Sequence, residues 1–165
     1  MSLARLLLSA VLGLLASCAS SPRTSADCYR GPKAHLVNGQ VIPPRQAPAS
    51  VRRAIAAANA IQHAPYQFGG GHGRPSHGLD CSGCVSLVLN RAGLLRSPMP
   101  SSAFRRYGRS GQGQWITVFA RRGHVFMTVC GLRLDTSSRG TGTGPRWSLN
   151  PRSTKGFSLR HPSGL

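Results

Sequence analysis

A glycine-rich run that leads into a cysteine at the start of a helix constrains this chain more than any other feature. The run covers residues 68–78 and is followed by Asp80-Cys81-Ser82-Gly83. Apolar residues then recur with a helical period, at Cys84, Val85, Val88, Leu89 and Ala92. The pattern predicts that Cys81 lies in the first helical turn, with Asp80 as the N-cap. Unpaired backbone N–H groups there favour negative charge, so the thiol is expected to ionise readily and act as a nucleophile.

Composition limits the partners of the chain. Its 165 residues suit one domain, and 21 Lys and Arg residues face only three acids, Asp27, Asp80 and Asp135. So basic a protein is attracted to polyanions. No recognition helix, zinc knuckle or aromatic stacking motif indicates nucleic acid, so anionic envelope polymers are the expected partners. The Cys and His spacing lacks the paired C-x-x-C signature of a zinc site, and we expect neither metal nor cofactor.

The N-terminus indicates export. A basic residue precedes an apolar run over residues 6–15, which is too short to span a bilayer comfortably and ends in small residues. Its last four residues, Leu15-Ala16-Ser17-Cys18, resemble the bacterial lipobox. We therefore expect residues 1–17 to be a lipoprotein signal peptide and Cys18 to carry the lipid, the alternative being an ordinary cleaved signal. Ala19 follows Cys18, which by resemblance to sorted lipoproteins favours an outer membrane facing the periplasm in a Gram-negative organism.

Composition and periodicity predict a tether, a domain and the first helix of that domain. Residues 18–49 are rich in Ser, Pro, Arg and Ala and are expected to form a flexible tether, with one small hairpin over residues 36–42 around an Asn-Gly turn. Residues 50–165 are expected to form the domain. Helical periodicity covers residues 49–63, with Ser50 as the expected N-cap.

The second half of the chain alternates loops and strand-like runs. Residues 96–113 are polar and contain prolines and glycines, which predicts a long loop. Strand-like runs cover residues 115–120, 124–130 and 132–136, and residues 157–160 could form a last edge strand. Two helices followed by three or four strands predict an α+β fold.

Two residues in the strand region are candidate partners for Cys81. His124 begins an apolar strand, 43 residues beyond Cys81, and is the candidate base. Asp135 lies 11 residues further, beyond a turn at Gly131, so two antiparallel strands would place it beside His124. An acid there can accept the ring N–H that does not face the nucleophile. The alternatives are a turn cap for Asp135 and, for Cys81, a buried structural cysteine or half of a disulfide.

Together these segments carry a resemblance to a known family. The runs Tyr66-Gln67-Phe68-Gly69-Gly70, Gly78-Leu79-Asp80-Cys81-Ser82-Gly83 and Gly123-His124-Val125 resemble the NlpC-type (p-sixty) cell-wall peptidases, which are papain-like cysteine hydrolases. The resemblance covers about residues 50–165. It implies a papain-like fold, in which a nucleophile helix packs on a small antiparallel β-sheet that carries the histidine. It also implies peptidoglycan stem peptides as substrate, cut most often between D-glutamate and a diamino acid.

The resemblance also implies a role for each site residue. Cys81 would be the nucleophile and His124 the general base. Asp135 occupies the third polar position, where the family commonly has histidine, and Asn or Gln in other members. Tyr66 matches the family's tyrosine near the nucleophile, and we assign Tyr66 and Ser82 to substrate binding or to the oxyanion.

The other cysteines leave alternatives open. In the implied fold the nucleophile helix packs on the His124 strand, so Cys84 and Cys130 could form a disulfide. The alternative is that both are small buried hydrophobes. A pair between Cys81 and Cys84 would inactivate the enzyme, and the state of Cys28 is not fixed by the sequence.

The expected protein is thus a monomeric, lipid-anchored cysteine peptidase that acts on peptidoglycan. A non-catalytic wall-binding lipoprotein on the same fold is the first alternative; its Cys81 would alkylate no faster than free cysteine. An amidase or acyl transferase with the same triad is the second, and product masses would separate it from a peptidase, because transfer and hydrolysis differ by one water.

Overall fold

The computed structural model describes residues 24, 29–72, 77–137 and 144–165. The expected signal peptide over residues 1–17, the expected lipid-bearing Cys18, and Cys28 lie outside these residues. Among the helices of the described part, none has the length and apolar character needed to cross a membrane.

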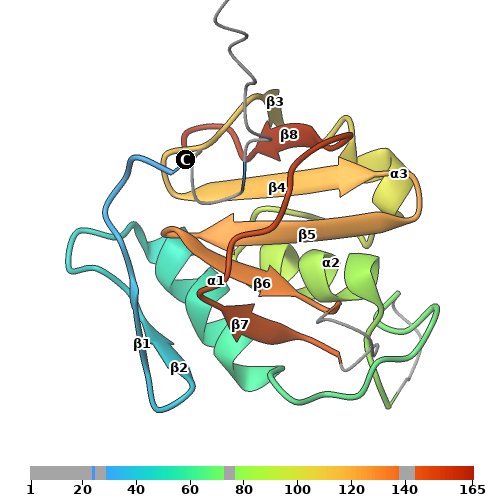
Figure 1. Ribbon diagram of the computed structural model, residues 1–165, viewed down its shortest axis with the longest axis horizontal. Coiled ribbons are helices and arrows are strands. Elements are labelled where there is room, and N and C mark those ends of the chain that lie inside the picture. Colours follow the sequence, from blue (N-terminus) through green and yellow to red (C-terminus); the bar gives the residue numbers. More distant parts are fainter. Residues whose placement is uncertain (1–23, 25–28, 73–76, 138–143) are drawn as a thin grey trace, which may run out of the picture.

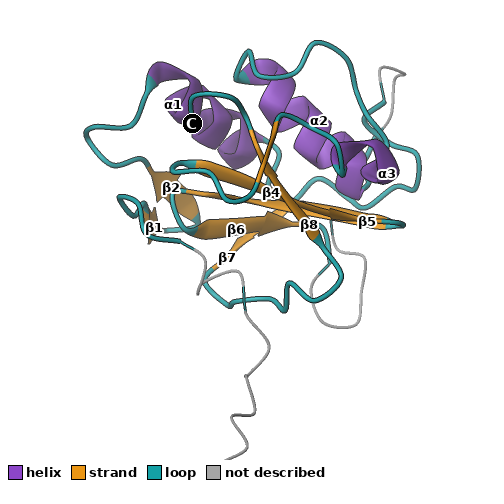
Figure 2. Ribbon diagram, turned by 90° about the horizontal axis from the view of Figure 1, so that it is seen from above, coloured by secondary structure: helices purple, strands orange, loops and turns teal. Residues whose placement is uncertain are grey.

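The described chain has a mixed α/β architecture built on antiparallel sheets. The larger sheet has six strands in the order β3-β8-β4-β5-β6-β7, and every neighbouring pair is antiparallel. Helices cover one face of this sheet, as Figure 2 shows. The strands are β3 (Arg109–Ser110), β4 (Ile116–Arg121), β5 (His124–Val129), β6 (Leu132–Asp135), β7 (Arg146–Ser148) and β8 (Ser158–His161).

The main core lies between the sheet and two helices, α1 (Ala49–Ala60) and α2 (Cys81–Arg91). Both pack against β5, and they also contact one another. Apolar side chains of the two helices meet the inward-facing residues of β5, and all of these are buried: Val51, Ile55, Val85, Val88, Leu89, Val125, Met127 and Val129. Burial of a side chain of this size stabilises a fold by about 1.5–3 kcal/mol. The sequence therefore fixes the position of α2 relative to β5 through its apolar stripe.

Local sequence determines where α2 begins and ends. The Asp80 carboxylate accepts a hydrogen bond from the Gly83 backbone N–H at 2.7 Å, which confirms Asp80 as the N-cap. At the other end, Gly93 follows the C-cap Ala92 with a φ of +77°, a conformation that favours glycine. Cys81 is thus the first residue of the helix, as predicted.

The glycine-rich loop packs directly against the first turn of α2. The Asp80 N–H donates to the Gly70 carbonyl at 3.2 Å. A Cβ on Gly83 would overlap the Gly70 carbonyl oxygen, so only glycine permits this approach. The loop and the helix therefore hold one another in place on either side of Cys81.

The predicted hairpin is present, and it is part of the packed body. Strands β1 (His35–Val37) and β2 (Gln40–Ile42) pair around an Asn-Gly turn. Val41 is buried, and its N–H and C=O each bond the side chain of Asn59 on α1 at 3.0 Å. This part of the segment expected as a tether thus lies against the domain, because it has an apolar residue to bury.

Four details of the predicted fold were wrong. Helix α1 begins after Pro48, which takes the N-cap position, so Ser50 lies inside the first turn and makes no cap hydrogen bond. The region expected as a loop contains α3 (Ser101–Phe104), anchored by the buried ring of Phe104, and the short strand β3. Strand β7 was not predicted. Strand β8 pairs with β4 on one side and β3 on the other, so it is not the sheet edge.

Candidate active site

Two elements distant in sequence bring Cys81 and His124 together. Cys81 is the first residue of α2 and His124 the first residue of β5, and these two elements pack on one another. The thiol lies near enough to the imidazole to contribute to raising the pKa of the imidazole. The imidazole Nε2 lies 3.1 Å from the Asp135 Oδ1. Because Nε2 faces the carboxylate, Nδ1 is the ring nitrogen that serves the thiol.

Strand register explains why Asp135 reaches His124. Strands β5 and β6 are antiparallel, with Met127 opposite Leu134. Continuing this register places Phe126 opposite Asp135, so His124 is its diagonal neighbour on the same face of the sheet. Diagonal pairs of this kind lie within reach of long or aromatic side chains. The predicted contact between His124 and Asp135 is therefore present, and its cause is the short β5–β6 turn.

The buried carboxylate of Asp135 is surrounded by donors. The guanidinium groups of Arg133 and Arg152 donate to its Oδ2 at 2.8 and 2.6 Å, and the Ser137 N–H donates to its Oδ1 at 3.1 Å. Burial alone would raise the pKa of Asp135. Hydrogen bonds from His124 and Ser137 and the charges of His124 and Arg152 outweigh it, so the pKa lies below its usual value and the group stays ionised.

The ionised carboxylate acts on His124. Burial alone would lower the pKa of the imidazole, but the hydrogen bonds to Asp135 and Cys81, together with their charges, raise it overall. Aromatic rings also limit the freedom of the imidazole: Phe126 and Phe157 each have their ring centroid 6.3 Å from it. The arrangement favours an imidazolium beside the thiol, with its ring orientation fixed from both sides.

Tyr66 lies close to the nucleophile. A backbone bridge to Leu79 brings it alongside the residues that precede Cys81. Its side chain is partly open to solvent, with 38% of the residue exposed. Burial, and then the charges of Cys81 and Asp80, raise the pKa of its phenol, so the hydroxyl stays protonated and able to donate.

The Ser82 hydroxyl has a different position from the expected one. It donates to the Asp80 Oδ1 at 3.0 Å and lies 3.2 Å from the His72 Nε2. The side chain is buried within this cluster and contributes to the start of α2. Nothing in the described contacts brings it to His124 or Asp135, so Tyr66 is the better-placed of the two residues assigned to substrate binding.

The remaining described cysteines are free thiols. Cys84 and Cys130 are both buried and form no disulfide, which corrects the pairing considered for them. Cys84 faces the core, and burial raises its pKa far above the usual range. Burial also raises the pKa of Cys130 to about 12, despite a hydrogen bond with Tyr29. Both behave as small buried hydrophobes.

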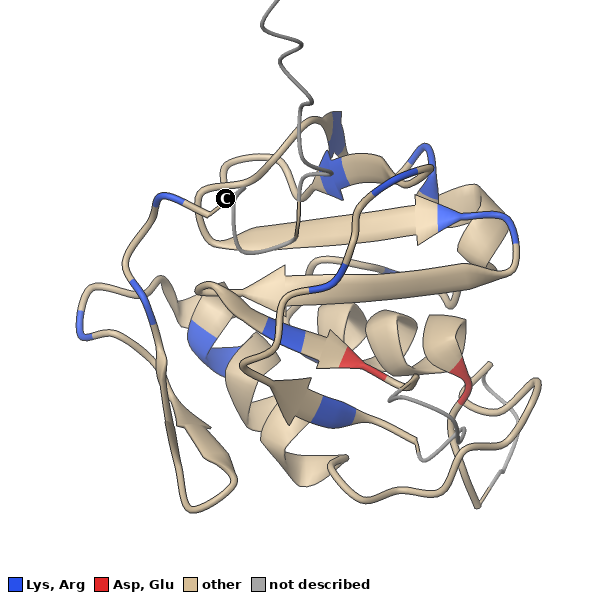
Figure 3. Cartoon of the chain, viewed as in Figure 1, with Lys and Arg blue, Asp and Glu red and all other residues tan. Residues whose placement is uncertain are grey.

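The arginines around Asp135 were not predicted. Figure 3 shows the two described acids at the end of β6 and at the start of α2, with basic residues along β6, β7 and the β7–β8 connection. Arg133 lies two residues before Asp135, and side chains two apart on a strand share a face, so periodicity could have indicated it. Arg152 comes from an irregular connection and has no such signal.

Comparison with known proteins adds no evidence on the family of this chain. No protein-family model matches the chain, and the curated proteins contain no match to it. Within the described ranges, no group of three or more His, Cys, Asp or Glu side chains is placed to hold a metal ion. The function of this site therefore has to be inferred from the arrangement of Cys81, His124 and Asp135.

Proposed function

We propose that this protein is a cysteine peptidase of the papain-like, NlpC type that hydrolyses amide bonds in peptidoglycan stem peptides. The observation that carries the proposal is the placement of the Cys81 thiol near the His124 ring, whose Nε2 lies 3.1 Å from the Asp135 carboxylate. A thiol at a helix N-terminus, a base and an orienting acid are the parts that covalent acyl transfer requires. The resemblance of the segments around Tyr66, Cys81 and His124 to the NlpC-type peptidases supplies the substrate class.

The reaction follows from these positions. The Cys81 thiol first passes its proton to His124, and the resulting thiolate, held beside the imidazolium, attacks the amide carbonyl carbon. The tetrahedral oxyanion collapses, the C–N bond breaks, and His124 donates its proton to the departing amine. Water then attacks the thioester, which releases the carboxylic acid and regenerates the thiol. Asp135 holds the imidazole throughout and stabilises its charged form.

Donors for the oxyanion lie beside the thiol. The backbone N–H of Cys81 is at the first position of α2, where helix geometry provides no acceptor within the helix. The Tyr66 phenol stays protonated and lies close to Cys81. We assign these two groups to the oxyanion, each acting where negative charge develops in the transition state.

The proposed setting is the cell envelope. The N-terminal pattern of residues 1–17 and Cys18 supports export and a lipid anchor, on an outer membrane facing the periplasm in a Gram-negative organism. A formal net charge of +18 favours retention on anionic envelope polymers. Stem peptides are the proposed substrate, and the bond between D-glutamate and a diamino acid is the proposed site of cleavage.

A matched pair of cysteine variants tests the proposal. Purified muropeptides are incubated with wild type, Cys81→Ala and Cys84→Ala, and the products are identified by mass spectrometry. Cys84 is the control because it is buried one helical turn away and has no contact with His124 among those found. We expect cleavage by wild type and Cys84→Ala, with none by Cys81→Ala. Cleavage by folded Cys81→Ala, or none by folded and reduced wild type, would contradict the proposal.

A further inference from the structure

A polar cavity lies next to Asp135 and is lined by residues that contact its carboxylate. It has a volume of about 1030 Å³ and is lined by Arg133, Ser137, Ser148, Asn150, Pro151, Arg152 and Ser153. The lining comes from β6, the end of β7 and the β7–β8 connection, which crosses in front of the sheet on the face without helices (Figures 1 and 2). The proposed peptidase chemistry uses none of the lining residues directly.

The two carboxylate oxygens of Asp135 have different partners. Oδ1 faces His124 and the Ser137 N–H, whereas Oδ2 receives both guanidinium groups, from Arg133 and Arg152. Arg133 and Arg152 both line the cavity and share this one carboxylate, so the cavity wall keeps an excess of positive charge.

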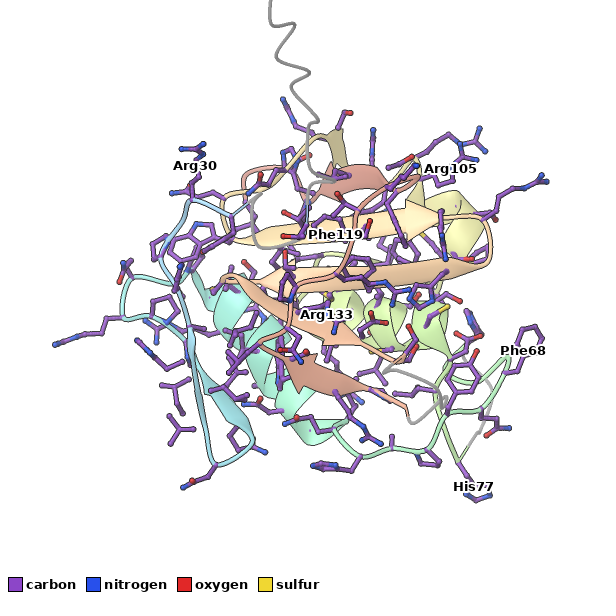
Figure 4. The ribbon with its side chains drawn as sticks, in the orientation of Figure 1. Arg30, Phe68, His77, Arg105, Phe119 and Arg133 are labelled. Carbon is purple, nitrogen blue, oxygen red and sulfur yellow. The ribbon has the colours of Figure 1, made fainter. Side chains whose placement is uncertain are left out.

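Donor capacity remains on this wall. Arg133 uses Nη1 for Asp135 and Nη2 for the Ser148 hydroxyl at 3.1 Å, while its buried Nε has no acceptor among the described residues. Figure 4 labels Arg133 on β6, next to the crossing connection. A guanidinium group has five donors arranged in a plane, which matches the oxygens of a carboxylate or a phosphate. The hydroxyls of Ser137, Ser148 and Ser153, which also line the cavity, can complete such a set of hydrogen bonds.

We propose that this cavity is an anion-binding subsite that accepts one carboxylate or phosphate group between Arg133, Arg152 and the serine hydroxyls of the lining. The cavity is much larger than a free anion, so the group belongs to a larger molecule that fills the rest of the space. An anion there competes with Asp135 for the guanidinium donors. Because Asp135 also contacts the His124 imidazole, binding of the anion affects the residue next to that imidazole. The binding itself does not depend on the proposed peptidase activity.

Arginine side-chain NMR tests the subsite directly. Inorganic phosphate and succinate are titrated separately into the purified protein at constant ionic strength, and the Nε–H signals of Arg133 and Arg152 are followed. We expect saturable shifts of both signals with at least one of the two anions. Shifts that grow linearly without saturation would indicate only the general attraction of a basic surface, and would overturn the proposal.

A pair of isosteric variants separates local from general charge. Asn150→Asp places a negative charge at the cavity, whereas Asn38→Asp makes the same change in the exposed β1–β2 turn, outside the cavity lining. We expect Asn150→Asp to weaken anion binding by about tenfold or more through repulsion, and Asn38→Asp to leave it unchanged. Equal effects of the two variants would overturn the proposal. Ser153→Asp repeats the test from another lining residue if Asn150→Asp does not fold.

Competition identifies the source of the anionic group. Muropeptide is added to Cys81→Ala protein that has been saturated with phosphate. The choice of muropeptide as the competing ligand rests on the proposed function. Loss of the phosphate-induced shifts assigns the subsite to a carboxylate of the substrate, and retained shifts assign it to a separate phosphate-bearing ligand. Either result is compatible with the anion subsite, and a failure of the muropeptide to bind affects only the proposed function.

Discussion

The molecule contains two aspartate–histidine pairs near the same cysteine, and they have different surroundings. Asp135 and His124 lie on neighbouring strands, while Asp80 and His72 lie at the start of α2 and in the glycine-rich loop. Both pairs have a ring nitrogen 3.1 Å from a carboxylate oxygen. The His124 side chain is 13% exposed and that of His72 is 28% exposed. A short distance between the two residue types therefore does not distinguish a catalytic pair from a structural one.

The arrangement of the ring nitrogens does distinguish them. Nε2 of His124 contacts Asp135 and leaves the other nitrogen for Cys81, as a proton-transferring base requires. In the second pair, Nε2 of His72 faces both Asp80 and the Ser82 hydroxyl, so no path through the ring connects nucleophile and acid. Ser82, His72 and Asp80 have the residue types of a triad without its geometry.

The two carboxylates also hold different groups in place. Asp80 accepts backbone hydrogen bonds from Gly83 at 2.7 Å and Gly69 at 3.0 Å, so it joins the helix start to the glycine-rich loop. Asp135 accepts from side chains of Arg133 and Arg152 and faces the imidazole. The first pair thus shapes the backbone around Cys81, and the second controls the charge of its partner.

The largest expected difference is between the two histidines. His124→Ala removes the base, and we expect kcat/KM on a stem-peptide substrate to fall by about 10²- to 10⁴-fold. His72→Ala removes contacts to Asp80 and to the Ser82 hydroxyl, away from His124, and should leave kcat/KM within the same order of magnitude. Steady-state kinetics of the two folded variants make the measurement. An equal loss in both would break the distinction between the pairs.

A smaller effect is expected when Asp135, the acid of the proposed catalytic pair, is neutralised. Asp135→Asn keeps the size of the side chain and removes the charge that raises the pKa of His124. Activity that requires the imidazolium is lost as pH rises through this pKa, so the alkaline limb of the pH profile should move to lower pH. We expect kcat to fall by about tenfold or more at neutral pH, through loss of orientation and charge.

The pH–rate profiles of wild type and Asp135→Asn, measured with the same substrate, check this expectation. An alkaline limb that keeps its position would show that Asp135 does not act on His124. The matched change at the other pair, Asp80→Asn, should leave the limb in place, since Asp80 does not contact His124.

The parts of the site that could be predicted from sequence are those set by short-range rules. Asp80 as N-cap, Cys81 as first helical residue and Gly93 at the helix end follow from the local sequence. His124 and Asp135 were paired correctly because only a tight turn separates their strands.

Features that depend on long-range packing were missed. Arg152 reaches Asp135 from an irregular connection, 17 residues along the chain, with no periodicity to indicate its direction. Strands β3 and β7 are two and three residues long, too short to show alternation. The place of β8 between β3 and β4 depends on sheet order, which a single strand does not encode. The Ser82 hydroxyl bonds Asp80, a contact that the sequence did not indicate.

The smallest expected effect concerns stability at the structural pair. Asp80→Ala removes the N-cap of α2, and we expect the free energy of unfolding to fall by about 1 kcal/mol at neutral pH. Although burial alone would raise the pKa of Asp80, hydrogen bonds from Gly83, Ser82 and His72 hold it below its usual value. The ionised carboxylate therefore contributes stability above the unfolded-state pKa of about 3.9, and this contribution is lost as pH falls through the lower folded-state value.

The difference between wild type and Asp80→Ala should consequently be largest at neutral pH and should shrink as the solution is acidified below about pH 4. Urea unfolding, monitored by circular dichroism at a series of pH values, measures the free energy of unfolding of wild type and of Asp80→Ala. A difference that stays constant down to the acid limit would mean that the Asp80 charge does not stabilise the start of α2. Asp80 would then stabilise the start of α2 equally well in its uncharged form. Only the contact of Asp135 with His124 would then distinguish the two carboxylates.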